Sequence, residues 1–366
     1  MERILLAGKI CSRNHSSDKD QKLVNVYSSN RQKDTLVISR PGIVLEDNVG
    51  STLQGLFGFN DNLYEVVSGI LKKNGSILSL AFDSWVISGW ETFPNLPVRA
   101  MASQGGKLHV AVSNSETRYT TIDGTIFIAE TPNFPVANLT RGISFGSNAF
   151  FFQNFNRSVY KWDGTSFTTT TTVAPWSVDD ELFSVTVHNS KIYISAGVVS
   201  SSRPISIYST EDGISFTTHT SNALSSDSKP IRIGIVLTSF GNSLYIASGR
   251  SVGPSESHND VYSSTDNGVN WSEIQPNSAW GVCTEGSMWA SSGKLFFLRG
   301  SLPAPILKDL WSSTDGVTWV QVISDIFGAD FTGDLSFKTF NAAHNDTMFV
   351  GASTLNSQNR IVYANN

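Results

Sequence analysis

The chain has 366 residues, of which only 16% are charged, and its formal net charge at pH 7 is −5. Its lysines and arginines are dispersed, which argues against a protein that grips phosphate backbones through a basic patch. No stretch approaches the roughly 20 apolar residues of a membrane span, and the apolar run from Ile4 to Gly8 is too short for a secretory signal.

The composition favours an all-β protein. Gly, Ser, Thr and Asn are abundant and aromatic residues reach 11%, which suits many short strands joined by polar turns. No sustained 3.6-residue apolar periodicity is present, and WSVDDELF at 176–183 is the best short candidate for a helix.

The N-terminal part divides into a polar segment and strand-like material. Residues 1–21 are polar and lie outside any repeat, so we expect either a docking arm or a disordered segment there. KLVNVYSS at 22–29 and DTLVISRPGIVL at 34–45 have the composition of strands.

One strand pattern recurs seven times along the chain, each copy with an aromatic or histidine side chain at its third position. The copies are NLYEVV at 62, KLHVAV at 107, NAFFFQ at 148, KIYISA at 191, SLYIAS at 243, KLFFLR at 294 and TMFVGA at 347. The third positions are Tyr64, His109, Phe150, Tyr193, Tyr245, Phe296 and Phe349. Spacings of 41 to 53 residues between these positions are typical of the blades of a β-propeller.

A glycine turn follows six of the seven copies. These turns read LKKNGSIL at 71, YTTIDGTIF at 119, YKWDGTSF at 160, YSTEDGISF at 208, YSSTDNGVNW at 262 and WSSTDGVTW at 311. The seventh copy ends at RIVYANN, 360–366, before a fourth strand. We therefore predict a single domain over 22–366, a propeller of seven four-stranded blades whose last blade is completed by one of the N-terminal strands. Six blades is the alternative count.

The turn motif S-x-D-x-G-x-x-W has a local physical interpretation. The Asp carboxylate can accept hydrogen bonds from backbone N–H groups, the Ser hydroxyl can cap the turn, and glycine supplies the positive φ. The motif resembles the Asp-box, or bacterial neuraminidase repeat, which implies a structural turn away from any active site. The positions concerned are Ser264, Asp266, Gly268 and Trp271, then Ser313, Asp315, Gly316 and Trp319, then Asp212, Gly213 and Phe216, and finally Asp163 and Gly164.

A sialidase-like glycosidase is the enzymatic alternative, because sialidases carry Asp-boxes on propellers. Such an enzyme needs an arginine cluster, a tyrosine nucleophile paired with a glutamate, and an acid. Arg40 stands in SRPGI, which differs in order from the sialidase pattern. The remaining arginines considered are Arg99, Arg118, Arg141, Arg203, Arg232 and Arg299, and none has a recognisable catalytic setting.

Other catalytic or metal-binding patterns are absent from the sequence. No nucleophile elbow, P-loop or H-E-x-x-H motif occurs, and the six histidines have no ligand spacing. His109 takes a repeat position that is aromatic elsewhere, so we expect it to pack. The cysteines, Cys11 and Cys283, are too far apart for a disulfide framework or metal site. We predict a protein that is not an enzyme and has neither cofactor nor metal.

A carbohydrate-binding adhesin is the second alternative, because tryptophans can stack on sugars. Trp162, Trp271, Trp311 and Trp319 fall at repeat positions and are explained by blade packing. Trp85, Trp90, Trp176, Trp280 and Trp289 are left as candidates for a ligand face.

Residues 21–75 resemble the start of the packaged-DNA stabilisation, or tail accessory, proteins of short-tailed bacteriophages. The matching elements are a strand from Val24 to Tyr27, a basic residue at Arg31, the turn Arg40-Pro41-Gly42, and a Gly-Leu-x-x-Phe-x-x-x-Leu-Tyr-x-Val run from Gly55 to Val66. The chain is short for that family.

The resemblance implies a structural component of the virion tail, a hub or nozzle assembled in the host cytoplasm. It implies a homo-oligomeric ring, commonly a hexamer, that contacts the portal or its adaptor and other tail proteins and helps to retain packaged DNA. A mildly acidic surface suits DNA that must pass without sticking. A cytoplasmic assembly factor of propeller type is a further alternative.

Overall fold

The computed structural model describes residues 98–327, with short gaps, and strands within 53–87 and 340–365. The gaps are 123, 125, 155, 178–179, 199–204, 221–223, 225–231, 252–255, 285 and 301–307. The chain forms two compact units, 1–83 and 84–366. This division falls inside the predicted domain 22–366, whereas the predicted arm 1–21 lies outside the described residues.

The first unit contains one four-stranded antiparallel sheet. Its strands are β1 (Leu53–Phe59), β2 (Asn62–Val67), β3 (Ile70–Lys73) and β4 (Ser76–Ile77), in that order across the sheet. The first predicted repeat strand, NLYEVV, is β2, so this copy belongs to the first unit.

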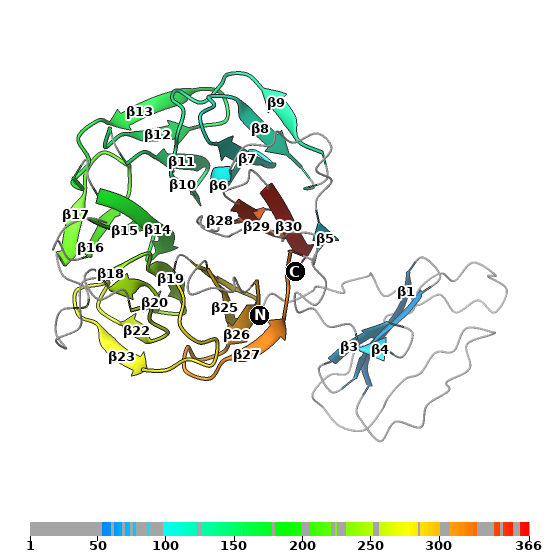
Figure 1. The fold of residues 1–366 in the computed structure, drawn as a ribbon. Helices are drawn as coiled ribbons and strands as arrows, with labels where there is room; N and C mark the ends of the chain where they lie inside the picture. The colour runs from blue at the N-terminus through cyan, green and yellow to red at the C-terminus, as the bar shows by residue number, and fades with distance from the viewer. Residues whose placement is uncertain are drawn as a thin grey trace. The chain divides into compact units, whose positions relative to one another are not determined.

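Five four-stranded antiparallel blades follow one another in the second unit, each from one continuous stretch of chain (Figure 1). Blade 1 contains β6 (Val98–Gln104), β7 (Lys107–Val112), β8 (Arg118–Thr121) and β9 (Ile128–Glu130). Blade 2 contains β10 (Arg141–Phe145), β11 (Asn148–Phe152), β12 (Val159–Trp162) and β13 (Phe167–Thr171). Blade 3 contains β14 (Asp180–His188), β15 (Lys191–Val198), β16 (Ser206–Thr210) and β17 (Thr217–Thr220).

Blade 4 contains β19 (Val236–Phe240), β20 (Ser243–Ala247), β22 (Val261–Ser264) and β23 (Ser272–Gln275). A two-stranded ribbon of β18 (Arg232–Ile233) and β21 (Arg250–Ser251) accompanies it. Blade 5 contains β24 (Ser287–Ser291), β25 (Lys294–Leu298), β26 (Leu310–Ser313) and β27 (Val320–Ile323).

A further sheet joins the C-terminal strands to an earlier part of the chain. It contains β28 (Phe340–His344), β29 (Thr347–Ser353), β30 (Asn359–Asn365) and β5 (Val86–Ile87). The last two strands pair through Val362 with Ile87 and Tyr363 with Val86. The closing strand is therefore β5, whereas the segments proposed for this role, 22–29 and 34–45, lie outside the described residues.

The sheets of the second unit form a β-propeller arrangement. The first strands of successive sheets contact one another in the order β6, β10, β14, β19, β24 and β28, and β28 contacts β6 (Figure 1). The all-β class and the propeller arrangement are confirmed. Seven blades are not confirmed, because the β1–β4 sheet that would supply the first one belongs to the other unit.

The described residues contain no helix, and the helix predicted over 176–183 is wrong. Trp176 is fully buried in the connection between blades 2 and 3, and β14 starts at Asp180. LFSVTVH alternates as a strand does, but its buried face carries the polar Thr186 and His188, whereas Val187 is exposed.

Apolar clusters fill the space between neighbouring blades. The cluster between blades 4 and 5 includes Val236, Val261, Trp280, Phe297 and Trp319. Three further clusters lie between blades 1 and 2, 2 and 3, and 3 and 4. Burial of apolar surface between sheets is the main stabilising contribution in such a ring.

Candidate functional site

The turn at 262–271 has the hydrogen bonds that its residues predict. The Ser264 hydroxyl donates to the Asp266 carboxylate at 2.8 Å and accepts from the Gly268 amide at 2.9 Å. The same carboxylate accepts from the Asn270 amide at 2.9 Å, and the Trp271 indole donates to the Gly268 carbonyl at 3.1 Å. The hydrogen bond from the Asn270 amide, which outweighs partial burial, lowers the pKa of Asp266.

Three other turns, in blades 2, 3 and 5, share the central feature of this network, an Asp carboxylate that accepts backbone amides. The carboxylate of Asp315 accepts the amides of Val317 and Thr318, both at 2.8 Å. Asp212 accepts those of Ile214 and Ser215, and Asp163 accepts those of Thr165 and Ser166. We call the four segments 160–167, 208–216, 262–271 and 311–319 the Asp turns.

Each Asp turn contacts the preceding blade. Gly316 has φ +78°, and a Cβ there would lie 2.7 Å from the Tyr245 ring of blade 4. Gly164, Gly213 and Gly268 similarly face Gln104 of blade 1, Phe150 of blade 2 and Ile207 of blade 3. Hydrogen bonds cross the same boundaries, from Thr170 to the Gly213 carbonyl, from Asn189 to Asn267, and from Gln275 to the Val317 carbonyl. The turns therefore join neighbouring blades.

The tryptophans considered for a ligand face are buried wherever the structure describes them. Trp176 and Trp280 are completely buried, and Trp280 stacks on Phe297. Trp289 is 3% exposed and stacks on Phe296. None of these three can offer an exposed face to a sugar, whereas Trp85 and Trp90 lie outside the described residues.

Two of the candidate arginines pair with aspartates, one in the ribbon that accompanies blade 4 and the other in blade 5. Arg232 and Asp260 form two hydrogen bonds of 2.5 and 2.6 Å with both side chains buried, next to the Tyr262 ring. Arg299 lies 3.4 Å from Asp309, which directly precedes β26 as Asp260 directly precedes β22.

The other candidate arginines are separate from these pairs. Arg141 donates to the Thr140 carbonyl at 2.7 Å, and Arg99 donates to Ser113 at 3.4 Å. Arg40 and Arg203 lie outside the described residues.

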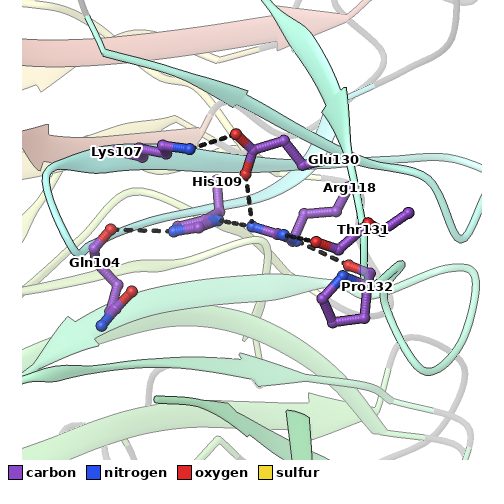
Figure 2. Close-up of polar contacts among 7 residues, drawn as sticks. All are labelled: Gln104, Lys107, His109, Arg118, Glu130, Thr131 and Pro132. Carbon is purple, nitrogen blue, oxygen red and sulfur yellow. Dashed lines mark hydrogen bonds and ion pairs between the residues drawn. The ribbon is translucent and has the colours of Figure 1, made fainter. Parts of the chain in front are cut away.

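A polar cluster in blade 1 contains the remaining arginine, Arg118 (Figure 2). One terminal nitrogen of its guanidinium group lies 3.1 Å from His109 Nδ1 and 3.3 Å from Glu130. Its Nε donates to the Pro132 carbonyl and its other terminal nitrogen to the Thr131 carbonyl, both at 2.9 Å. Glu130 also pairs with Lys107.

The cluster spans the boundary between blades 1 and 2. The Arg118 guanidinium carbon lies 4.3 Å from the centroid of the Trp162 ring, a geometry that supports a cation–π interaction. His109 and Arg118 are each 2% exposed, and His109 Nε2 lies 3.1 Å from the Gln104 carbonyl. A buried guanidinium group needs acceptors for its N–H donors, and four of them are supplied here by His109 of β7, Glu130 of β9 and the carbonyls of Thr131 and Pro132.

The environment keeps His109 uncharged. Burial lowers its pKa to about 4, and the charges of Arg118 and Lys107 add to this effect against the Gln104 hydrogen bond and Glu130. Burial raises the pKa of Glu130, but the hydrogen bonds of Lys107 and Thr120 and the nearby cations lower it below its usual range.

Two residues of this cluster, His109 and Arg118, are unusual at their repeat positions in the sequence. His109 was expected to pack as an aromatic, and it does lie 5.9 Å from the Trp162 ring, but it also bonds to Arg118. Arg118 takes a position filled by Val159, Ile207, Val261 and Leu310 in the other blades. A charged residue at a repeat position that is otherwise aliphatic could have indicated a partner for the histidine.

The other described histidines and Cys283 do not form a common site. His188, His219 and His258 bond to three different serines, Ser239, Ser209 and Ser251. Burial raises the pKa of the Cys283 thiol to about 12. Within the described ranges, no three His, Cys, Asp or Glu side chains are grouped as metal ligands. The same part of the chain has no helix of the length and apolarity needed to cross a membrane.

Comparison with known proteins supports the fold. The chain matches no protein-family model and no curated relative. The solved structure of a protein named YjhT is similar to it, with a TM-score of 0.53 and 14% sequence identity over 75% of this chain and 95% of that chain. At this identity the likeness concerns the fold alone.

Proposed function

We propose that this protein is a non-enzymatic scaffold whose rigid blades present loops to assembly partners. The observation that supports the proposal is that its buried arginines pair with separate carboxylates. Arg118, Arg232 and Arg299 pair with Glu130, Asp260 and Asp309 in three different blades. A sialidase-type site would instead need its arginines to converge on one substrate carboxylate.

The Asp turns support the same interpretation. Their carboxylates accept backbone amides, and their glycines lie against the preceding blade. These residues are committed to the blade contacts, so substrate binding would have to compete with contacts that hold the ring together.

The setting that we propose is a phage tail, as a hub or nozzle ring that contacts portal, adaptor and other tail proteins near the packaged DNA. This part rests on the resemblance of residues 21–75. The run from Gly55 to Val66 lies in β1 and β2, which pair as Gly55 with Val66 and Phe57 with Tyr64. We propose that the first unit attaches the protein to the tail, and that the propeller contacts the other tail proteins.

We further propose that the propeller closes as six blades. The successive contacts of β6, β10, β14, β19, β24 and β28 support this count, as does the contact between β28 and β6. Pairing of β5 with β30 would then join the start of the propeller to its end, so that no long sheet edge is left at the closure.

Native mass spectrometry of the intact chain over a range of concentrations tests the scaffold proposal. We expect a ring of several copies, with a hexamer as the first candidate from the resemblance. The same preparation should neither hydrolyse a fluorogenic sialoside nor bind a glycan array.

A chain that stays monomeric and hydrolyses the sialoside would overturn the proposal in favour of the glycosidase. A monomer that binds glycans without turnover would favour the adhesin. An Arg232→Met variant serves as the control for contamination, because loss of the buried pair with Asp260 should destabilise this chain and reduce any hydrolysis of its own, whereas a contaminating sialidase would not respond.

A further inference from the structure

Blade 1 departs from the other blades at two positions on the same face of its sheet. Where blades 2 to 5 have Phe150, Tyr193, Tyr245 and Phe296, blade 1 has His109. Where they have Val159, Ile207, Val261 and Leu310, blade 1 has Arg118. His109 pairs with Thr120 across the strands, so Arg118 is its diagonal neighbour, within reach of a long side chain.

The hydrogen bond between these side chains requires one protonation state. A guanidinium group can only donate, so His109 Nδ1 must accept and carries no proton. The remaining ring proton is then on Nε2, which donates to the Gln104 carbonyl at 3.1 Å. The neutral Nε2–H tautomer of His109 is therefore built into the contact (Figure 2).

Arg118 connects this histidine to the outermost strand of the blade. Its other donors hold the carbonyls of Thr131 and Pro132, which follow directly after β9. It also lies opposite Glu130 in the strand register. The strand β9 has only three residues, so these side-chain bonds add to a short register with β8.

We propose that the His109–Arg118 pair is an acid-sensitive latch, which holds the β8–β9 hairpin closed while His109 is neutral and releases it when His109 gains a proton. An imidazolium would place a second donor and a second positive charge 3.1 Å from the guanidinium group, in a buried position. The acceptor of Arg118 would be lost, and the two cations would repel each other.

The groups that influence protonation of His109 come from the four strands of blade 1. Arg118 of β8 and Lys107 of β7 oppose protonation, whereas Glu130 of β9 and the Gln104 carbonyl favour it. Burial has the largest effect and lowers the pKa, so the neutral state prevails at pH 7. Trp162 closes the cluster on the side of blade 2 and carries no charge.

The direction of the pH effect follows from the lowered pKa. The closed hairpin binds a proton at His109 near pH 4, whereas the open hairpin binds one near the ordinary pKa of 6.5. The latch is therefore complete above pH 6.5 and weakens as the pH falls to 4, by about tenfold in the opening equilibrium for each pH unit.

Amide hydrogen exchange of the intact protein, converted to protection factors at each pH, tests this proposal. We expect the protection of β8 and β9 to fall about tenfold per pH unit between 6.5 and 4. The equivalent hairpin of blade 5, β26 and β27, has Phe296 and Leu310 at these positions and should keep its protection over the same range.

A His109→Gln variant is the matched control, because its amide can accept from Arg118 and donate to the Gln104 carbonyl without titrating. We expect its β8–β9 protection to be independent of pH in this range. An equal slope in the variant and the wild type would overturn the proposal. If the variant does not fold, NMR of the wild-type imidazole decides, since a pKa near 6.5 or an Nδ1–H tautomer would also overturn it.

Discussion

Blades 1 and 4 each bury an arginine, and they satisfy it in different ways. Arg232 of blade 4 makes two hydrogen bonds to the buried carboxylate of Asp260, so its charge is balanced in place. Arg118 of blade 1 divides its donors among two carbonyls, a neutral histidine and the partly exposed Glu130. The comparison shows that two buried arginines of one propeller can be satisfied either by a closed ion pair or by a network that depends on protonation.

The difference has energetic consequences. A bidentate arginine–carboxylate pair fails as a whole when one partner is removed, because the other is left as a buried charge. A network with several neutral acceptors loses less when any one of them changes. Blade 4 should therefore be sensitive to substitution, and blade 1 to pH.

The largest effect is expected for Asp260→Asn. This substitution leaves the Arg232 charge buried without its carboxylate, and we expect the free energy of unfolding to fall by about 3–5 kcal/mol. The matched variant Glu130→Gln should cost about 1 kcal/mol, because Arg118 retains its carbonyl and histidine acceptors. Urea denaturation at pH 7 measures the free energy of unfolding of both variants. Equal losses would contradict the distinction between Arg232 and Arg118.

The second effect is the pH dependence of stability that His109 contributes. Its folded-state pKa of about 4 lies below its ordinary value of 6.5, so the contribution is complete above pH 6.5 and is lost as the pH falls to 4. The loss is on the order of 3 kcal/mol.

The difference between wild type and His109→Gln in urea denaturation isolates this contribution. Burial also lowers the pKa values of His188 and His219, and their effects remain in both proteins. Parallel pH profiles for the two proteins would contradict the expected contribution of His109.

The third effect concerns the insertion of an Asp turn against the neighbouring blade. Gly316→Ala would place a methyl group 2.7 Å from the Tyr245 ring at φ +78°, and we expect a loss of about 2 kcal/mol. Gly105 in the β6–β7 turn also has a positive φ, +59°, but a Cβ there would meet nothing within 4 Å, so Gly105→Ala carries only the conformational cost of about 1 kcal/mol. Thermal unfolding should rank the two variants in this order.

The smallest effect is expected for Asp266→Ala. Its carboxylate accepts amide hydrogen bonds in an exposed turn, and the loss of such a cap typically costs about 1 kcal/mol. Thermal unfolding measures this loss, with glycan binding of the same variant as the second readout. Unchanged stability together with lost binding would identify the turn as a ligand site.

The repeats in the sequence located the second strand of each four-stranded sheet. The six copies from KLHVAV to TMFVGA correspond to β7, β11, β15, β20, β25 and β29. The blade count could not be predicted, because NLYEVV has the same pattern but lies in β2 of the first unit. The closing strand β5 has two residues, too few for an alternating pattern to mark it.

The turn residues could be predicted because their contacts are local in the sequence. The blade 1 cluster could not be predicted because its contacts join distant segments. Ser264, Asp266 and Gly268 bond within one turn, so their spacing in the sequence carries the geometry. The contact of Arg118 with His109 depends on the pairing of β7 with β8, and its contact with Trp162 depends on the packing of two blades. Register and packing are set by tertiary structure.

The proposed role as a structural part of a virion tail is tested most directly by quantitative mass spectrometry of purified phage particles made from the genome that encodes this chain. We predict peptides from both units at a fixed copy number per particle, consistent with a ring. Particles that are complete and infectious without the chain, while the chain is abundant in the lysate, would contradict that role.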